Sequence, residues 1–383
     1  MTNASTPAIQ PMIRLDAVTK SYPGQTDCAV SALSLDILDG EIVVLVGPSG
    51  CGKTTTMRLI NRLIEPTAGK IYLGGEDVTT VNADQLRRRI GYVIQQVGLF
   101  PHMSIADNVG ILPRALGWNK KRIRSRVDEL LGLVGLDPDT YRGRYPKQLS
   151  GGQQQRVGVA RALAADPPVM LMDEPFGAID PITRDRLQDE FLGLQAQIGK
   201  TIVIVTHDIQ EAVKLGDRIA IFAEGGRLAQ YDTPAQILTH PADDFVASFI
   251  GAGAAVRGLV LERADAVPLQ PVEVIRAGEG PLTHPSPGSC RVLAVDDAGA
   301  PQRWFHPAQP AGDGHQVAVV RGGQSLYDAL DQMLHAQDDV AVVLDEHGQI
   351  LGQLSWSTVL RRATLPATET APKQNPHVSI GHR

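Results

Sequence analysis

The sequence contains few cysteines, and their placement excludes the structures that cysteines usually stabilise. The three cysteines, Cys28, Cys51 and Cys290, are far apart and show no CxxC spacing. An odd number of widely separated cysteines suggests neither a disulfide framework nor a zinc site. This pattern fits a reducing cytoplasm.

The sequence also lacks a surplus of positive charge. Lys and Arg total 36 against 42 Asp and Glu, which gives a net charge of -6. Domains that bind nucleic acid usually carry a basic surplus. We therefore expect no nucleic-acid partner.

Long hydrophobic runs are missing as well. The most apolar stretches, such as IVVLVG and TIVIVTH, are far shorter than the roughly 20 residues that a helix needs to span a bilayer. The first residues, MTNASTPAIQPMIRL, hold no apolar core of signal-peptide length behind a basic patch. We expect any association with a membrane to depend on partners.

What the sequence does contain is the pattern of an α/β protein. Three runs are apolar on both faces, at residues 41–46, 169–174 and 201–207. Such runs are typical of central parallel strands that helices cover. Residues 90–95 add a further strand, and residues 218–231 predict a hairpin around Gly225 and Gly226.

Changes in composition divide the chain of 383 residues into domains. Residues 12–250 alternate strand and helix patterns, and within them residues 103–165 are helix-like and free of strands. We expect one domain with an inserted helical subdomain. Small residues and glycines in FIGAGAAVRG, residues 249–258, predict a linker.

The rest of the chain predicts a second domain and a tail. Residues 251–365 are expected to form an α+β domain, in which residues 317–363 read strand, helix, strand, turn, strand, helix. The last residues, 366–383, are rich in Pro and Thr and are predicted to be disordered.

A glycine-rich loop carries the clearest chemical signal. GPSGCGKTT, residues 47–55, matches G-x-x-x-x-G-K-[ST] and lies between a strand pattern and a helix pattern. Backbone N–H groups and the helix dipole then favour a bound phosphate. The predicted ATP-binding residues of this loop are Gly47, Pro48, Ser49, Gly50, Cys51, Gly52, Lys53, Thr54 and Thr55.

Individual side chains of this loop have expected roles. Lys53 would neutralise the β- and γ-phosphate oxygens, and the Thr54 hydroxyl would ligate Mg²⁺. Cys51 is either a redox-sensitive thiol at a helix start or a small residue at a variable loop position.

An acidic strand end follows about 120 residues later, in VMLMDEP. Asp173 would hold Mg²⁺ through water, and Glu174 is placed to polarise the water that attacks the γ-phosphate. An apolar run that ends in Asp-Glu is a weak signal by itself, but it becomes strong after a phosphate loop.

A second glycine turn, LSGGQ, precedes a convincing helix. Ser150 is a good N-cap, and the turn offers free N–H groups at an outer surface, which is another anion site. Because the helical insertion separates this turn from the first loop, we expect it to cap the nucleotide of a second copy in a head-to-tail homodimer. The residues expected to cap the nucleotide of the other copy are Leu149, Ser150, Gly151, Gly152 and Gln153. The alternative is a plain N-capped helix.

Together these motifs resemble the ATP-binding-cassette (ABC) family, whose fold is a P-loop NTPase core of mixed sheet with a helical subdomain. The resemblance implies that Tyr22 stacks on adenine and that His207 in THD contacts the γ-phosphate. It also implies that Gln95, or its neighbour Gln96, senses Mg²⁺ and water, and that Asp180 in FGAIDP crosses the dimer. The alternative for Tyr22 is a tyrosine that packs in the core, and the alternative for His207 is a hydrogen-bonded histidine of the core.

Longer stretches, such as IGYVIQQVGLFPHMSIADNV, resemble the ATPase subunits of importers for osmoprotectants. That resemblance implies uptake of glycine betaine, choline, carnitine or proline-type solutes. It also implies integral membrane permease subunits, a secreted solute-binding protein, and a place on the cytoplasmic face of the inner membrane. The alternatives are an ABC ATPase for another small solute, such as an amino acid, and a non-transport ABC ATPase.

The C-terminal domain is similar to a cystathionine-β-synthase (CBS) pair, a module carried by the same importers. Its second copy lies at residues 317–363, and the first is degenerate because it lacks a recognisable helix. In copies of this module that bind nucleotides, a Ser or Thr is followed by an Asp that binds the ribose. Ser355 matches the first of these residues, but Thr358 occupies the position of the Asp. Nucleotide binding and a purely structural role in dimerisation are therefore both open.

Overall fold

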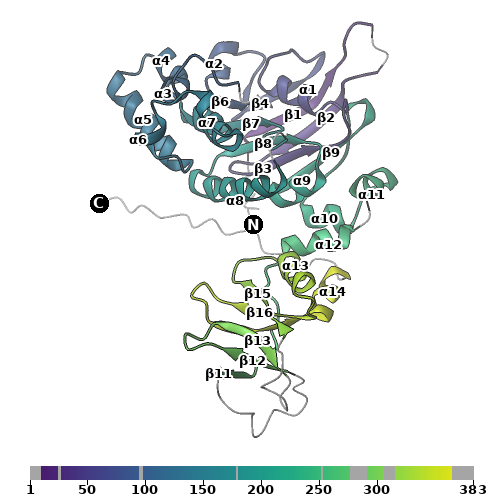
Figure 1. Cartoon of the computed structure of the whole chain (residues 1–383). Helices are drawn as coiled ribbons and strands as arrows, with labels where there is room; N and C mark the ends of the chain where they lie inside the picture. Colours follow the sequence, from purple (N-terminus) through teal and green to yellow (C-terminus); the bar gives the residue numbers. More distant parts are fainter. Residues whose placement is uncertain are drawn as a thin grey trace, which may run out of the picture. The chain divides into compact units, whose positions relative to one another are not determined.

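The computed structural model describes residues 10–24, 27–94, 98–177, 180–251, 253–276, 291–305 and 315–364. The chain divides into two compact units (Figure 1). The first contains Met1–Ile237 and Pro241–Ile250, and the second contains Leu238–His240 and Gly251–Arg383. None of the helices in the described ranges has the length and apolar composition of a membrane-spanning segment.

One sheet of the first unit is antiparallel, with the strand order β2-β1-β4-β5. The strands are β1 (Ile13–Lys20), β2 (Val30–Ile37), β4 (Ala68–Leu73) and β5 (Glu76–Asp77). Along β1, buried Ile13 and Leu15 alternate with exposed Arg14, so one face of the strand packs on the core. The sequence patterns above single out none of these strands, because register shifts interrupt the alternation along β1.

The other sheet contains the predicted central strands, in the order β10-β9-β3-β8-β7-β6. The strands are β3 (Ile42–Val46), β6 (Ile90–Val93), β7 (Val169–Asp173), β8 (Thr201–Thr206), β9 (Arg218–Ala223) and β10 (Arg227–Asp232). All neighbours pair in parallel except β10. Every residue of β3 and β8 is buried, which confirms the prediction of strands covered on both faces.

The predicted hairpin is also confirmed. Strands β9 and β10 pair antiparallel and are joined by a 3₁₀ turn, Glu224–Gly226. Gly225 adopts a φ of 72° in this turn, a left-handed conformation that favours glycine.

The register of the large sheet places three strand ends side by side. Val46 of β3 pairs with Thr206 of β8, and Val205 of β8 pairs with Asp173 of β7. Parallel strands end at the same edge of a sheet, so the loops after these strands begin next to one another. This edge carries the candidate site.

Helices accompany the sheets of the first unit. Outside residues 103–165 they are α1 (Lys53–Ile60), α2 (Ala83–Arg87), α8 (Pro181–Ile198), α9 (Ile209–Leu215), α10 (Pro234–Thr239) and α11 (Asp244–Ile250). Helix α1 follows the loop after β3, and only two residues separate the end of β8 from the start of α9. Both helices therefore start at the edge of the sheet that carries the site.

Between residues 103 and 165 the described elements are all helical (Figure 1). They are α3 (Ile105–Val109), α4 (Ile111–Ala115), α5 (Lys120–Leu133), α6 (Pro138–Tyr141), a 3₁₀ turn (Pro146–Gln148) and α7 (Gly151–Leu163). On α5, buried Ile123, Val127 and Leu130 recur at the spacing of one helix face. The lysines and arginines of its first turns are left at the surface.

The second unit begins with α12 (Ala254–Gly258) and a 3₁₀ turn (Leu259–Leu261). The boundary between the two units falls within the predicted linker, residues 249–258, but most of this segment is helical, since α11 extends to Ile250 and α12 begins at Ala254. Alanine favours helix, and Gly253 has a left-handed φ of 87° that lets the chain turn into α12.

Two sheets form the rest of the second unit, in the orders β11-β12-β13-β14 and β15-β16-β17. The first contains β11 (Val274–Arg276), β12 (Val292–Val295), β13 (Pro301–Phe305) and β14 (His315–Gln316). The second sheet and its helices are β15 (Ala318–Arg321), α13 (Leu326–Ala336), β16 (Val340–Leu344), β17 (Ile350–Ser355) and α14 (Trp356–Thr364).

The later half of this unit has the predicted order of strand, helix, strand, turn, strand, helix. In the earlier half, the described residues 272–276 and 291–305 contain strands and no helix. The predicted disordered tail, residues 366–383, lies outside the described residues.

Candidate nucleotide-binding and hydrolysis site

The loop after β3 passes so close to other backbone that two of its glycines have no room for a side chain. A Cβ on Gly47 would lie 2.3 Å from the Phe222 carbonyl oxygen, and one on Gly52 would lie 2.2 Å from that of Ala29. Gly52 is the N-cap of α1 and has no side chain to accept a hydrogen bond from the first turn. The first N–H groups of α1 can therefore serve a bound anion.

Lys53 is buried and held across this loop. Its Nζ donates to the carbonyl oxygens of Gly47 at 2.7 Å and Pro48 at 2.8 Å. The side chain is only 7% exposed, and these carbonyl contacts satisfy a buried ammonium group. The arrangement holds a positive charge where the loop would place phosphate oxygens.

Cys51 lies beside Lys53 but lacks the properties of a reactive thiol. It is 1% exposed, and its Sγ is 3.6 Å from Lys53 Nζ. Burial raises the pKa of the Cys51 thiol, and the nearby Lys53 ammonium offsets only part of this effect. Of the two alternatives, the structure therefore favours the small loop residue.

The two predicted Mg²⁺ ligands of α1 and β7 meet. Thr54 Oγ1 donates to Asp173 Oδ1 at 3.2 Å. Burial raises the pKa of the Asp173 carboxyl, and the neighbouring Glu174 carboxylate raises it further. A hydroxyl and a partly desolvated carboxylate are hard oxygen ligands of the kind that Mg²⁺ takes from a protein when phosphates complete its shell.

Glu174 and His207 form a second pair at the same edge of the sheet. His207 Nδ1 lies 3.0 Å from Glu174 Oε1. Glu174 has a φ of 45°, and its N–H donates to the Val205 carbonyl oxygen at 2.9 Å. A positive φ is uncommon for a residue other than glycine and often occurs at functional sites. The His207 side chain is 62% exposed, so the pair is open to a ligand.

The glycine turn at residues 149–153 is a capped helix start. Ser150 Oγ accepts from Gln153 N at 3.3 Å, and Gln153 Oε1 accepts from Ser150 N at 3.0 Å. Gln153 Nε2 also donates to Tyr141 Oη at 3.0 Å. Within the described chain, residues 149–153 bond to near neighbours and to Tyr141, and none of these bonds reaches residues 47–55.

Two further predicted residues lie at the ends of elements. Asp180 is the N-cap of α8 and accepts from Thr183 N at 3.0 Å, and hydrogen bonds from Thr183 lower the pKa of its carboxyl. The Tyr22 ring is half-buried, with Lys20 Nζ 5.1 Å from its centroid. The structure brings neither residue into the cluster around Asp173.

Gln95 and Gln96 lie outside the described residues. The structure does describe Gly98, just after them, and its carbonyl oxygen accepts from Arg161 Nη1 at 2.6 Å. Arg161 belongs to α7, so this hydrogen bond joins the helix after the second glycine turn to the segment that follows Gln95 and Gln96. The sequence patterns missed this residue because a long-range side-chain contact leaves no local signal.

Comparison with known proteins places these features in a family. The family model described as "ABC transporter" matches residues 30–177. The osmoprotectant import ATP-binding protein OsmV of Salmonella typhimurium is 50% identical over 276 residues, which cover 71% of this chain and 72% of that protein. The chain belongs to the ABC transporter ATP-binding family.

Other relatives agree with this assignment. The glycine betaine/carnitine/choline transport ATP-binding protein OpuCA of Bacillus subtilis is 55% identical over 240 residues, which cover 63% of this chain and 62% of that protein. A solved dimeric structure of the ATP-binding cassette MJ0796, bound to ADP and phosphate after hydrolysis, has a TM-score of 0.52 and 36% identity. It covers 58% of this chain and 98% of its own. The P-loop ABC ATPase fold is thereby confirmed for the first unit.

Proposed function

We propose that this cassette hydrolyses ATP at Glu174 and thereby drives the import of osmoprotectants across the cytoplasmic membrane. The observation that carries the proposal is the pairing of Glu174 with His207 at 3.0 Å, beside the pairing of Thr54 with Asp173 at 3.2 Å. Four side chains with complementary roles in phosphoryl transfer share one edge of the sheet.

In the proposed reaction, Glu174 polarises a water molecule whose oxygen attacks the γ-phosphorus. The bond between this phosphorus and the leaving oxygen of ADP breaks, and the proton of the water passes toward the Glu174 carboxylate. His207 holds the carboxylate in place and contacts the γ-phosphate. Lys53 neutralises the phosphate oxygens, so the rate comes mainly from positioned charge.

We propose Thr54 and Asp173 as the protein ligands of Mg²⁺, with Gln95 as a further one. Magnesium bound there would neutralise charge on the β- and γ-phosphate oxygens. The described residues hold no group of three or more His, Cys, Asp or Glu side chains that could form a complete cage. This agrees with an ion whose remaining ligands are phosphates and water.

We propose that the turn of Ser150, Gly151 and Gly152 closes over the nucleotide of a second copy, with Asp180 crossing the homodimer. Gly151 supports this role, because a Cβ built on it meets nothing within 4 Å and its surface is free for a partner. The MJ0796 cassette, which resembles this chain, is itself dimeric.

Mixed dimers test the trans arrangement. A chain with Lys53→Ala cannot hold ATP, and a chain with Ser150→Arg cannot cap it, so each alone should be inactive. Mixed together, they form one intact composite site per heterodimer, and about half of the wild-type activity per heterodimer should return. Mixtures that stay inactive would contradict the proposal.

We propose that Tyr22 stacks on the adenine ring. Its ring is half-buried, and the Lys20 ammonium lies near one face, which supports a ring that is held but accessible. Tyr22→Ala should weaken ATP binding about tenfold, whereas Tyr22→Trp should not.

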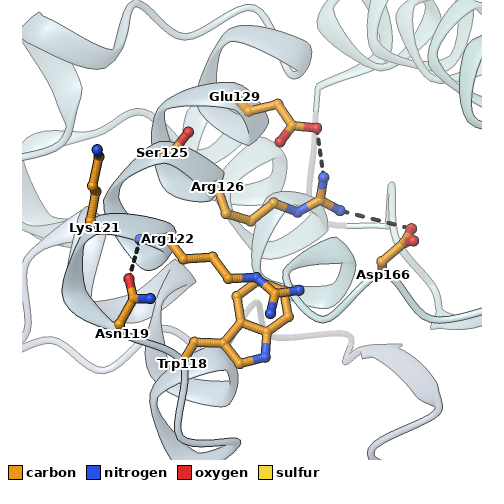
Figure 2. A pocket seen from close by; sticks show the side chains of 8 residues that line it. All are labelled: Trp118, Asn119, Lys121, Arg122, Ser125, Arg126, Glu129 and Asp166. Carbon is orange, nitrogen blue, oxygen red and sulfur yellow. Dashed lines mark hydrogen bonds and ion pairs between the residues drawn. The ribbon is translucent and has the colours of Figure 1, made fainter.

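We propose integral membrane permease subunits as partners, reached through the helical subdomain on the cytoplasmic face. An open pocket of about 530 Å³ lies there. Figure 2 shows the side chains that line it, with basic Lys121, Arg122 and Arg126 of α5 among them. The Arg122 guanidinium stacks over the Trp118 ring at 3.5 Å, and Arg126 bonds to Glu129 at 2.6 Å. A basic surface with an aromatic anchor supports docking to a protein partner.

We propose the second unit as a CBS-like module for dimerisation or regulation. Ser355 Oγ accepts from Thr358 N at 3.3 Å and lies 2.9 Å from Thr358 Oγ1, so it caps the start of α14. A serine used in this way has less capacity left for a ribose hydroxyl, which supports the structural role.

The solute is proposed from the relatives, which are named for osmoprotectants, glycine betaine, carnitine and choline. The test is reconstitution of the cassette with candidate permease and solute-binding proteins from the same genome. ATP inside the vesicles should drive uptake of labelled glycine betaine, choline, carnitine or proline. Uptake of an unrelated amino acid instead would favour the alternative importer, and the absence of any permease gene would favour a non-transport cassette.

The hydrolysis itself is tested by Glu174→Gln. This substitution keeps the shape of the side chain but removes the base, so ATP should bind, close the dimer and remain unhydrolysed. Size-exclusion chromatography with ATP should show a stable dimer, and turnover should fall by at least about 100-fold. Unchanged turnover would overturn the proposal.

A further inference from the structure

Three buried polar side chains are hydrogen-bonded into the turn that carries His207. Thr206 at the end of β8 is 2% exposed, Gln188 on α8 is 5% exposed and Glu211 on α9 is 7% exposed. Buried polar groups are stable only when they are hydrogen-bonded, so their partners define what they hold in place.

Glu211 joins the other two. The Thr206 hydroxyl donates to Glu211 Oε2, and Gln188 Nε2 donates to Glu211 Oε1 at 3.4 Å. A hydroxyl has one donor, so Thr206, which uses it on Glu211, can act toward other groups only as an acceptor. It accepts from the Asp208 N–H at 3.1 Å.

Hydrogen bonds therefore hold the turn through the residues on both sides of His207. Thr206 and Asp208 are joined through the Thr206 hydroxyl, and Asp208 Oδ1 caps α9 by accepting from Gln210 N at 2.8 Å and Glu211 N at 3.4 Å. The His207 side chain itself is 62% exposed, so little packing holds it. Its approach to Glu174 therefore depends on the backbone of this turn.

The same network reaches the helix that starts at the proposed dimer interface. Helix α8 begins at its N-cap Asp180, and Gln188 lies about two turns further along. A second link joins Arg184 Nη1 of α8 to Asp208 Oδ2 at 4.0 Å. Glu174, His207, Arg184 and Glu211 also line one small cavity of about 30 Å³.

We infer that Glu211 is a positioning residue for hydrolysis, because it orients the Thr206 hydroxyl and thereby holds the turn that presents His207 to Glu174. Through Gln188 it couples this turn to α8. The inference rests on the proposed roles of Glu174 and His207, but Glu211 itself touches neither the nucleotide loop nor the reacting atoms. It hydrogen-bonds to Thr206, Asp208 and Gln188, and it acts through these three residues.

The test compares kcat and KM for ATP in the purified full chain. Glu211→Ala and Thr206→Val should lower kcat by at least about tenfold and leave KM within about threefold, because nucleotide binding uses other residues. Thr206→Ser keeps the hydroxyl and should retain most activity. Glu211→Gln should also retain it, since an amide oxygen can accept from Thr206 while its NH₂ donates to the Gln188 amide oxygen.

Gln195→Ala is the matched control for Gln188→Ala. Gln195 lies on the same helix and donates to the carbonyl oxygens of Gly40 at 2.8 Å and Lys200 at 3.2 Å, away from the His207 turn. Both substitutions remove a side-chain bond of α8, but only Gln188→Ala should lower kcat.

The outcomes separate this inference from the proposed function. If Glu174→Gln retains turnover, the proposed function fails. If Glu174→Gln is inactive while Glu211→Ala and Thr206→Val turn over ATP at the wild-type rate per folded molecule, the inference fails alone. If Glu211→Ala does not fold, Thr206→Val decides, because valine has the shape of threonine without its hydroxyl. Equal losses in Thr206→Val and Thr206→Ser would also overturn the inference.

Discussion

Thr54 and Asp173 are 119 positions apart in the chain, yet Thr54 Oγ1 donates to Asp173 Oδ1 at 3.2 Å. One residue lies in the first turn of α1 and the other ends β7. Their meeting depends on the parallel pairing of β3 with β8 and of β8 with β7. The sheet therefore brings two oxygen ligands to one place.

This pair predicts the magnesium dependence of hydrolysis. Asp173→Asn and Thr54→Val should each lower ATPase activity by at least about 100-fold at 1 mM Mg²⁺, because a charged or polar oxygen ligand is lost. Activity measured against Mg²⁺ concentration should show a higher half-saturating value. Thr54→Ser keeps the hydroxyl and serves as the control; a loss in this variant equal to that of Thr54→Val would contradict the assignment.

The open space at Gly151 predicts an effect that is confined to the dimer. Gly151→Asp should leave the melting temperature within about 2 °C of wild type, since its Cβ meets nothing within 4 Å. In a Glu174→Gln background it should abolish the ATP-dependent dimer seen by size-exclusion chromatography. Gly132→Asp, at another open glycine on α5, should not. A dimer that persists in the Gly151 variant would show that the turn faces no partner.

Burial predicts that Cys51 is a slow thiol. Its raised pKa leaves little thiolate at pH 8, so in a chain with Cys28→Ser and Cys290→Ser the remaining thiol should react with a disulfide reagent at least about tenfold more slowly than in urea. ATP should slow the reaction further. Fast labelling of the folded chain would instead support a redox role for Cys51.

The burial of Glu211 predicts a dependence of stability on pH. Burial raises the pKa of its carboxyl above the ordinary value of 4.5, so the folded chain keeps this proton at pH values where the unfolded chain has released it. The contribution of this group to the free energy of unfolding therefore falls as pH rises from the unfolded-state pKa to the higher folded-state pKa. Glu211→Gln has no charge to bury and should be more stable than wild type at pH 7.

Thermal unfolding followed between pH 4.5 and pH 8 checks this prediction. The difference in melting temperature between Glu211→Gln and wild type should shrink toward the acidic end. A difference that is constant with pH would mean that Glu211 titrates in the folded chain as it does in the unfolded chain.

Local features of the site could be predicted from the sequence. The phosphate loop is contiguous, and its glycine and lysine pattern lies within a few residues of Lys53, although the backbone that crowds Gly47 and Gly52 comes from distant parts of the chain. Ser150 and Gln153 form their capping box within one turn of α7. The hairpin at Gly225 is likewise a property of neighbouring residues. The boundary between the units lies within residues 249–258, but the sequence did not indicate that α12 begins there, because small residues are compatible with both loop and helix.

Other features needed the tertiary structure. Nothing near Glu211 in the sequence indicates that its carboxylate would accept from Thr206 and Gln188, since the three side chains come from different elements. The bond from Arg161 to the Gly98 carbonyl oxygen spans 63 positions and leaves no periodic pattern. The pairing of Glu174 with His207 could be expected from a family resemblance, but its distance could not.

The amino-acid sequence by itself determined the phosphate loop, the capped glycine turn and the buried strands, because each depends on backbone conformation and apolar spacing over a few consecutive residues. The tertiary structure decided which side chains meet: Thr54 with Asp173, Glu174 with His207, and Glu211 with Thr206. The first two pairings follow from the parallel register of β3, β8 and β7, and register is set by the packing of the whole sheet rather than by any one strand. Glu211 meets Thr206 across the turn between β8 and α9, where the start of the helix is fixed by its packing on the sheet.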